Sequence, residues 1–484
     1  MSRILAIDLG AESGRGVIGT LSDRRTLNLD EVHRFQNGPT TFAGIMHWDI
    51  LRIISEVRTA IKLAAESGTI ASLGVDAWGV DFALIDHQGM LLANPLHYRD
   101  ARMNGFIDKV FTRVSQQEIY AQTGIQTMQI NTLFQLASLA EYAPKLLEAA
   151  DKLLFIPDLI HYALSGNPHS EFTIASTSQM LDISTRAWST NIIHRLGLPT
   201  QLLPDVSLDG SHYGGIIDSQ LPAGVQGIPV IAPGGHDTAC AVAAVPAHPG
   251  ENWAYLSSGT WSLLGLELTS PVLTHAAHTY NVTNEGGVLG TVRLLKNIAG
   301  LWLVQESRKA YARMGRERSY DELTRLAADA PALGSWVDPD HPTLISPEDM
   351  PLAIRELCLA SGMTPPEGVG ATIRCCLDSL ALKYRKTLRI MEELTGRKID
   401  TLHIVGGGSQ NRLLNQIAAD ATGCTVVAGP VEATAIGNVL LQAVSMGWVN
   451  DLRELRTIVR DSVSLEIFAP DPVMQARFAE VPDF

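Results

Sequence analysis

The sequence predicts an α/β protein of two domains, and three observations lead to this fold class. The chain has 484 residues, more than one hydrophobic core normally serves. Apolar strand-like runs alternate with helix-like periodic segments in both halves, a pattern typical of mixed α/β layers. A strand–loop–strand arrangement near the N-terminus also returns near the middle of the chain, which indicates that one fold plan is used twice.

The N-terminal residues predict a β-hairpin. Ile4 to Ile7 form a short apolar run that ends at Asp8. The small residues from Gly10 to Gly16 then favour a turn, and Val17 resumes the apolar pattern. Such a turn presents small polar groups and free N–H groups to a ligand.

The second hairpin is predicted from Trp253 to Leu266. Trp253 to Leu256 lead into the loop Ser257 to Thr260, and an apolar run follows. Two unrelated hairpins would give the same pattern, but duplicated domains explain its recurrence. Local Pro and Gly content near Pro246 to Gly250 places the boundary, so the expected domains are 1–246 and 247–484.

A helix and a strand are predicted after the first hairpin. Asp49 can cap a helix from Ile50 toward Ser67 that ends at Gly68, because apolar residues recur there at spacings of three and four. Ala71 to Val75 then have the composition of a buried strand. This order is the one expected for alternating layers.

The C-terminal half repeats the alternation. A longer apolar period predicts a helix from Ala371 to Thr395 with a stop at Gly396. A strand is expected from Thr401 to Val405.

Composition limits the partners of the protein. There are 51 acidic and 37 basic residues, giving a formal charge of −14, and such a surface repels nucleic acid. Asp8 interrupts the N-terminal apolar run too early for a secretory signal, and the sequence has no stretch typical of a membrane span. We therefore expect a cytoplasmic protein that binds neither nucleic acid nor membrane, as a monomer or a small homo-oligomer.

The five cysteines show no spacing typical of zinc ligands. We expect reduced thiols, and a disulfide between Cys358 and Cys375 is the alternative.

Three small-residue loops are candidates for nucleotide binding. The sequence has no P-loop and no dinucleotide-binding glycine pattern. Instead, small residues gather in Asp8 to Arg15, Ser258 to Thr260 and Gly406 to Asn411. Glycine lets backbone N–H groups approach a phosphate closely, and Arg15 offers a positive charge. Each loop taken alone is more often only an ordinary turn, and the three together are more informative.

Carboxylates at two strand or turn ends are candidates for chemistry. Asp8 ends an apolar strand, where a carboxylate needs a cation or donors, and it can hold magnesium or serve as a cap. Asp237 follows the turn Gly234-Gly235-His236 and begins an apolar segment, which suits a general base or an N-cap.

The segment Gly74 to Phe82 contains an indole among hydrogen-bonding groups. Trp78 and Gly79 lie between Asp76 and Asp81. Stacking combined with hydrogen bonds is typical of sugar sites, and a hairpin with a core tryptophan is the alternative.

These loops and the His236-Asp237-Thr238 motif resemble the FGGY family of carbohydrate kinases. The similarity runs from about Ile4 to about Val444, and several blocks carry it in one order: His33 to Gly38, Trp78 to Phe82, Tyr98 to Asp100, Ser257 to Ser262, Asn284 to Gly287 and Leu295 to Ile298. The resemblance implies two actin-like (ribonuclease H-like) domains with an ATP- and sugar-binding cleft between them.

The resemblance also implies roles for individual residues. Asp237 is expected to be the catalytic base, and the residues expected to bind the sugar are Gly79, His236, Asp237, Thr238 and Asn297. ATP is expected to be bound by Ala11, Glu12, Ser13, Gly14, Arg15, Thr260, Gln305 and Gly407. Asp8 is expected to reach Mg²⁺, with water between them.

The implied activity is ATP-dependent phosphorylation of a ketose at O1. L-rhamnulose is the expected substrate, with L-fuculose or L-xylulose as alternatives. A non-catalytic nucleotide switch or sugar sensor on the same fold is the alternative from another class.

The first loop departs from the pattern of many relatives. Ala11 and Glu12 stand where many sugar kinases of this family carry hydroxyl residues. We expect the Glu12 side chain to turn away from the phosphates, which leaves Ser13 as the side-chain hydroxyl of the loop.

Overall fold

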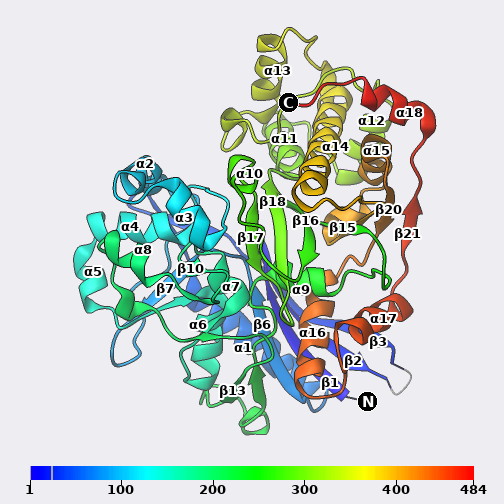
Figure 1. The fold of residues 1–484 in the computed structure, drawn as a ribbon. Coiled ribbons are helices and arrows are strands. Elements are labelled where there is room, and N and C mark those ends of the chain that lie inside the picture. The colour runs from blue at the N-terminus through cyan, green and yellow to red at the C-terminus, as the bar shows by residue number, and fades with distance from the viewer. Residues whose placement is uncertain (1, 23–24) are drawn as a thin grey trace. The chain divides into compact units, whose positions relative to one another are not determined.

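A computed structural model describes residues 2–22 and 25–484 of the chain (Figure 1). The chain divides into two compact units. Unit 1 comprises Met1–Ala244, Glu267–Leu294 and Ala433–Ser462, and unit 2 comprises Val245–Leu266, Leu295–Glu432 and Val463–Phe484. The predicted domain boundary after residue 246 lies near the point where the chain first passes from unit 1 to unit 2. The chain then returns to unit 1 twice, so a single boundary does not describe the two units.

Unit 1 is built on a six-stranded sheet. Its strands lie in the order β13-β14-β6-β1-β2-β3, where the bounds are His212–Gly215, Pro229–Ile231, Ser72–Ala77, Ser2–Leu9, Ser13–Leu21 and Leu27–Gln36. β1 pairs antiparallel with β2 and parallel with β6, and β14 pairs parallel with β6. The predicted N-terminal hairpin is thus confirmed.

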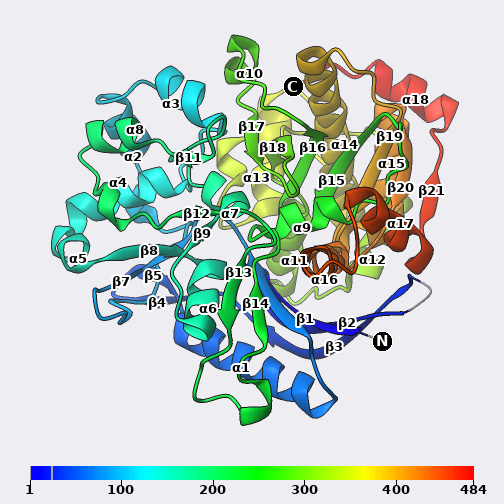
Figure 2. The same ribbon diagram turned by 60° about the horizontal axis from the view of Figure 1, so that its bottom comes forward.

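Helices cover both faces of this sheet. Gly16 and Gly19 lie on β2 an odd number of residues apart and so point to opposite faces. A Cβ at Gly16 would meet Ala60 on α1 (Ile50–Glu66), whereas one at Gly19 would meet Val439 on α16 (Ala433–Ser445). Figure 2 shows α1 and α16 on the two sides of β1–β3. The C-terminal helix α16 therefore packs against the N-terminal hairpin.

Unit 2 repeats this plan. β15 (Trp253–Ser258) pairs antiparallel with β16 (Ser262–Leu268) and parallel with β19 (Thr401–Val405), which pairs parallel with β20 (Thr425–Ala428). β21 (Glu466–Phe468) adds an antiparallel edge. The second predicted hairpin is confirmed, and it occupies the same place in its sheet as the first.

The helices predicted by apolar periodicity are present. α1 has Asp49 as its N-cap, with the carboxylate accepting from Arg52 N, as predicted. α14 (Gly368–Thr395) ends at left-handed Gly396 as predicted and begins three residues before the predicted start. The predicted strands correspond to β6, which runs from Ser72 to Ala77, and to β19.

The remaining elements complete the two units. Unit 1 also contains a second apolar cluster around β7 and α4. Its other strands and helices are β4 (Pro39–Phe42), β5 (Ile45–Trp48), β7 (Phe82–Ile85), α2 (Phe106–Phe111), α3 (Gln116–Thr123), α4 (Thr132–Tyr142), α5 (Pro144–Ala149), β8 (Lys152–Phe155), α6 (Ile156–Ser165), β9 (Ser170–Glu171), α7 (Phe172–Ser176), β10 (Leu181–Asp182), β11 (Ala187–Trp188), α8 (Thr190–Arg195), β12 (Val206–Ser207), α9 (Asp237–Ala243), α10 (His275–Thr279), β17 (Thr283–Gly286) and α17 (Leu452–Ser462). β18 (Val292–Ile298) crosses from unit 1 into unit 2, which also holds α11 (Trp302–Arg313), α12 (Tyr320–Ala328), α13 (Met350–Ala360), α15 (Arg412–Thr422) and α18 (Pro472–Ala479).

Two absences concern the described residues, 2–22 and 25–484. No helix in them has the length and hydropathy needed to cross a membrane. The five cysteines are free and buried, so the expectation of reduced thiols is confirmed in this structure.

Gly437 marks the closest approach of α16 to α9. A Cβ at this position would lie 1.9 Å from the backbone oxygen of Cys240, and backbone cannot move aside cheaply. We expect Gly437→Ala to destabilise the protein by about 1–3 kcal/mol or more through overpacking, measured by thermal and urea unfolding. Gly224→Ala is the matched control because nothing lies within 4 Å of its added Cβ. Equal stability of the two variants would contradict this packing.

Candidate functional site

Three carboxylates emerge at one edge of the unit 1 sheet. Asp8 and Asp76 are register partners at the carboxyl ends of the parallel strands β1 and β6. Past the end of β14, His236 forms a parallel bridge with Ala77, and Asp237 follows it. The carboxyl edge of parallel strands is where α/β proteins bind ligands, so parallel pairing gathers these acids at a candidate site.

Asp8 is paired with a cation. Asp8 and Arg15 face each other across the β1–β2 hairpin. Arg15 Nε and Nη2 donate to Asp8 Oδ2 at 2.9 and 2.8 Å. The positive charge of Arg15 therefore compensates this carboxylate.

Asp76 is fully buried, with 0% of its surface exposed. Asn438 Nδ2 of α16 donates to its Oδ2 at 2.6 Å, whereas its Oδ1 has no hydrogen-bond partner among the residues that the structure describes. Burial, and secondarily the nearby charge of Asp8, raises the pKa of Asp76 well above its usual range.

Asn438 and Gln442 are residues that the sequence analysis missed. Gln442 Nε2 donates to Asn438 Oδ1 at 2.6 Å, and Gln442 Oε1 accepts from Ser72 Oγ at 2.7 Å. Both amides are buried, so their hydrogen bonds fix α16 against β6 and orient the donor to Asp76. The sequence signal that could have identified them is an Asn and a Gln spaced four residues apart in an otherwise apolar helix.

Asp237 is the first residue of α9. His236 is the N-cap residue, so the alternative of Asp237 as N-cap is wrong. Asp237 Oδ1 accepts from the backbone N and hydroxyl of Thr238 at 2.5 and 3.1 Å. Burial raises the pKa of Asp237, with His236 acting to lower it and Asp8 to raise it further.

His236 lies between Asp237 and a buried ion pair. Its Nε2 is 3.4 Å from Asp237 Oδ1, and its Nδ1 is 3.2 Å from Glu285 Oε2. Arg293 Nη2 is 3.1 Å from the same Glu285 oxygen and donates to His236 Nδ1 at 3.0 Å. Although burial acts to raise the pKa of Glu285, the charges of Arg293 and His236 prevail and lower it. The sequence analysis assigned no role to Glu285 or Arg293.

Gly79 lies beside the His236 ring. A Cβ at position 79 would be 3.4 Å from His236 Nε2 and 3.3 Å from the Thr177 side chain. Unit 1 therefore brings together four of the predicted sugar-binding residues: Gly79, His236, Asp237 and Thr238. Asn297, the fifth, lies on β18 in unit 2.

Trp78 is a core side chain. It is 6% exposed, and its ring centroid lies 4.2 Å from that of Trp48. Both indole N–H groups donate to Asp81 Oδ2, and Gln135 Nε2 donates to Asp81 Oδ1. Burial raises the pKa of Asp81 to about 6, against the effect of these donors. Trp78 is therefore a core residue, but β6 and β7 lie in different sheets, so the hairpin of that alternative is wrong. The side chains of Trp78 and Asp81 are both buried.

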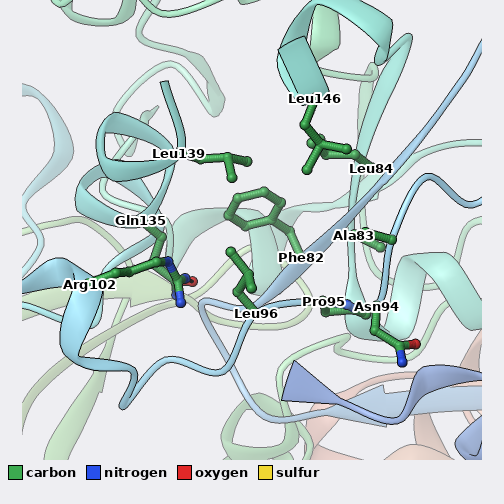
Figure 3. A pocket seen from close by; sticks show the side chains of 11 residues that line it. Phe82, Ala83, Leu84, Asn94, Pro95, Leu96, Arg102, Gln135, Leu139 and Leu146 are labelled. Atoms are coloured by element: carbon green, nitrogen blue, oxygen red, sulfur yellow. Dashed lines mark hydrogen bonds between the residues drawn. The ribbon is translucent and has the colours of Figure 1, made fainter. Parts of the chain in front are cut away.

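A pocket elsewhere in unit 1 is lined mainly by apolar residues (Figure 3). Arg102 and Gln135 lie together at one end of it, and Phe82 points into its middle. None of the predicted site residues lines this pocket, and Gln135 links it to the Asp81 network. The pocket is therefore separate from the cluster of carboxylates.

The first candidate phosphate loop connects β1 to β2. Gly10 N donates to Ser13 O at 2.8 Å, which closes the turn formed by Ala11, Glu12 and Ser13. A Cβ at Gly14 would overlap the Phe35 ring, so glycine is required there for packing. The Glu12 side chain is exposed.

Unit 2 brings its three candidate residues into neighbouring segments. Gln305 Nε2 on α11 donates to Thr260 Oγ1 at 3.2 Å. A Cβ at Gly408 would collide with Ser258, so the loop that begins at Gly406 lies against the end of β15. Gly407 itself has nothing within 4 Å of an added Cβ, which leaves room for a ligand to approach its backbone.

A magnesium ion held directly by protein is not supported by this geometry. Among the residues that the structure describes, no three His, Cys, Asp or Glu side chains are grouped as metal ligands. Asp8 and Asp76 are hard oxygen donors at one edge, and Asp76 Oδ1 is unpartnered. Mg²⁺ usually keeps several waters and uses one or two carboxylates together with phosphates. The residues therefore fit a magnesium ion held through water.

Sequence comparisons identify a family whose models match most of the chain. Models of the FGGY family of carbohydrate kinases match the chain, the N-terminal domain over residues 3–244 and the C-terminal domain over residues 254–446. A rhamnulokinase of Bacteroides thetaiotaomicron is 44% identical over 467 residues, covering 96% of this chain and 95% of the relative. A rhamnulokinase of Enterococcus faecalis is 38% identical over 473 residues, covering 97% and 94%.

Solved structures share the fold at low sequence identity. A ligand-bound xylulose kinase of Lactobacillus acidophilus has a TM-score of 0.79 at 16% identity, and a glycerol kinase of Plasmodium falciparum with ADP has 0.78 at 16%. Each comparison covers 99% of this chain and 96% of the other. The predicted α/β fold with two actin-like domains is confirmed.

The buried Asp76 gives the site a pH-dependent stability. An acid whose pKa is raised by folding binds its proton more tightly in the folded state, so this stabilisation is lost as pH rises. We expect the melting temperature of Asp76→Asn to exceed that of wild type increasingly from pH 4 to pH 8. Asp30→Asn on the exposed surface controls for removing one charge. A wild-type protein more stable than Asp76→Asn at pH 8 would show instead that an ionised Asp76 stabilises the fold.

Proposed function

Because the chain belongs to the FGGY family of carbohydrate kinases, we propose that it transfers the terminal phosphoryl group of ATP to O1 of L-rhamnulose. The observation that carries the substrate is the 38–44% identity to the rhamnulokinases above over nearly the whole chain. The products are L-rhamnulose 1-phosphate and ADP, formed in the breakdown of L-rhamnose.

Asp237 is the catalytic base in this proposal. As the sugar O1 forms its bond to the γ-phosphorus, the bond from that phosphorus to the β,γ-bridging oxygen breaks and the C1 hydroxyl proton passes to the Asp237 carboxylate. The bonds from Thr238 to Asp237 Oδ1 fix the carboxylate on the first turn of α9. The neighbouring imidazole of His236 supports this role, because its Nε2 lies 3.4 Å from Asp237 Oδ1 and can interact with the carboxylate as its charge changes.

The sugar would be held by Gly79, His236, Asp237 and Thr238 of unit 1 and by Asn297 of unit 2. The absence of a side chain at Gly79 leaves the His236 ring edge accessible to a hydroxyl group. The Glu285–Arg293 pair holds that ring from its other nitrogen. An oriented imidazole beside a carboxylate discriminates hydroxyl positions by hydrogen bonding.

The nucleotide would be bound by the loops at the two equivalent hairpins. Ala11, Glu12, Ser13 and Gly14 offer backbone N–H groups to the phosphates, and Arg15 adds a positive charge while paired to Asp8. In unit 2, Thr260, Gln305 and Gly407 would complete the site. Gln305 Oε1 is buried without a hydrogen-bond partner, which suits an acceptor reserved for a ligand.

Asp8 would reach Mg²⁺ through water molecules. When bound, Mg²⁺ supplies neutralisation of the phosphate charge. Arg15 keeps Asp8 oriented toward the candidate phosphate loop.

The proposal extends to the setting of the enzyme. ATP and a small ketose are the partners, and nucleic acid and membranes are not. We place the protein in the cytoplasm, as a monomer or a small homo-oligomer.

Replacing the base tests the mechanism. We expect Asp237→Asn to lower kcat by about 10²–10⁴-fold, because the amide cannot accept the hydroxyl proton. The KM for ATP should change little, since the nucleotide contacts lie elsewhere. A coupled ADP-release assay measures kcat, and calorimetry of ATP binding to the variant is the control. Turnover retained in Asp237→Asn would remove the base assignment.

A panel of ketoses tests the substrate. With ATP and magnesium, we expect L-rhamnulose to give a higher kcat/KM than L-fuculose or L-xylulose in the same assay. If another ketose gave the highest kcat/KM, the substrate assignment would be wrong and the assignment as a sugar kinase would stand. If no sugar stimulated ATP turnover, the protein would instead be a nucleotide switch or sugar sensor.

A further inference from the structure

One short buried segment accepts hydrogen bonds from three parts of unit 1 that carry site residues. The segment 171–177 consists of Glu171, the five residues of α7 and Thr177. Its four polar side chains, Glu171, Thr173, Ser176 and Thr177, are all buried. None of these four residues was assigned a role from the sequence.

The first half of the segment holds the loop that precedes Asp237. Glu171 Oε2 accepts from Gly235 N at 2.8 Å and from two N–H groups of its own helix. Thr173 Oγ1 accepts from His236 N at 3.1 Å. The two residues before Asp237 are therefore both bound through their backbone.

The second half holds the Gly79 loop and the strand β17. Thr177 Oγ1 accepts from Val80 N at 3.1 Å, next to Gly79. Ser176 Oγ accepts from Gly286 N of β17 at 2.8 Å, next to Glu285. The two loops that present Gly79 and Asp237 and the strand that presents Glu285 thus each donate a backbone N–H to the segment 171–177.

The direction of these bonds is fixed by the helix itself. Each hydroxyl group donates its own hydrogen bond within the segment. Thr173 donates to Glu171 Oε2, Ser176 to Thr173 O and Thr177 to Ile174 O. Each oxygen is then left as an acceptor. Because the acceptor oxygens belong to one short helix and its two cap residues, they link the positions of the two loops and of β17.

We propose that the segment 171–177 is the positioning element of the sugar site, with Glu171 and Thr173 setting the place of Asp237 and Thr177 setting the place of Gly79. The inference rests on the proposed function, because it assigns these four residues to the kinase reaction. They are positioning residues that touch neither substrate nor nucleotide. Burial raises the pKa of Glu171 to about 7, against the effect of the groups that donate to it.

The two halves of the segment predict different kinetic defects. A misplaced base slows the chemical step, so Thr173→Val should lower kcat about tenfold or more. A misplaced Gly79 loop weakens ketose binding, so Thr177→Val should raise the ketose KM and change kcat less. Thr173→Ser and Thr177→Ser keep the hydroxyl and should restore most of each loss. Ser178→Ala is the matched control, since the Ser178 hydroxyl bonds only Ala175 O and Met180 N.

A double-mutant cycle separates positioning from general damage. If Thr173 acts through Asp237, Thr173→Val should cost little further activity in the Asp237→Asn background. Full additivity, or equal losses in Thr173→Val and Thr173→Ser, would overturn the proposal. So would a kcat defect in Ser178→Ala as large as that in Thr173→Val.

Amide hydrogen exchange of the free protein gives a readout that does not need a substrate. In Thr173→Val, exchange should accelerate at residues 235–237 and stay unchanged in β19 of unit 2. Unchanged exchange at residues 235–237 would overturn the proposal even in an active enzyme. A wild-type protein without ketose-stimulated turnover would refute the proposed function, and the exchange result would then decide alone whether the segment positions these loops.

Discussion

The gathering of three carboxylates at one sheet edge is the constraint on which the rest of unit 1 depends. Parallel pairing of β6 with both β1 and β14 brings Asp8, Asp76 and Asp237 together. Like charges in a buried place are costly, and each acid is relieved differently. Arg15 pairs with Asp8, an amide donor meets Asp76, and His236 faces Asp237. The same edge therefore offers an ion pair, a buried acid with a raised pKa and a carboxylate beside an imidazole.

This arrangement suits a reaction that needs charge placement more than covalent chemistry. Phosphoryl transfer requires an acceptor for one proton and compensation for the phosphates. Arg15 and the backbone N–H groups of the first loop supply compensation on the same hairpin. The fold thus prepares an acidic protein to receive an anion.

Local patterns were sufficient to predict much of the fold. Both hairpins, α1 with its Asp49 cap, the end of α14 at Gly396 and the strand at Thr401 follow from periodicity and capping over a few residues. The family resemblance supplied the candidate site, and unit 1 does gather Gly79, His236 and Asp237. The roles of these residues stay predictions.

What the sequence did not predict depends on long-range contacts. Asn438 bonds Asp76 across 362 positions, and no local pattern identifies such a partner. The local sequence predicts Trp78 either as a stacking platform or as a core residue. Trp48 and Gln135, which belong to separate elements and donate to Asp81, make it a core residue. The acceptors of the segment 171–177 were missed because serine and threonine in a short helix are ordinary when their partners are unknown.

The late return of α16 to unit 1 has a consequence for protein synthesis. The face of the sheet that α16 covers, and the donor for Asp76, belong to residues 433–462, which leave the ribosome after most of unit 2. At the usual rate of translation, roughly ten to forty seconds separate residue 244 from residue 433. During that time the first sheet has one apolar face open and a buried acid without its amide. Truncation near residue 430 would therefore leave unit 1 incomplete although most of its residues are present.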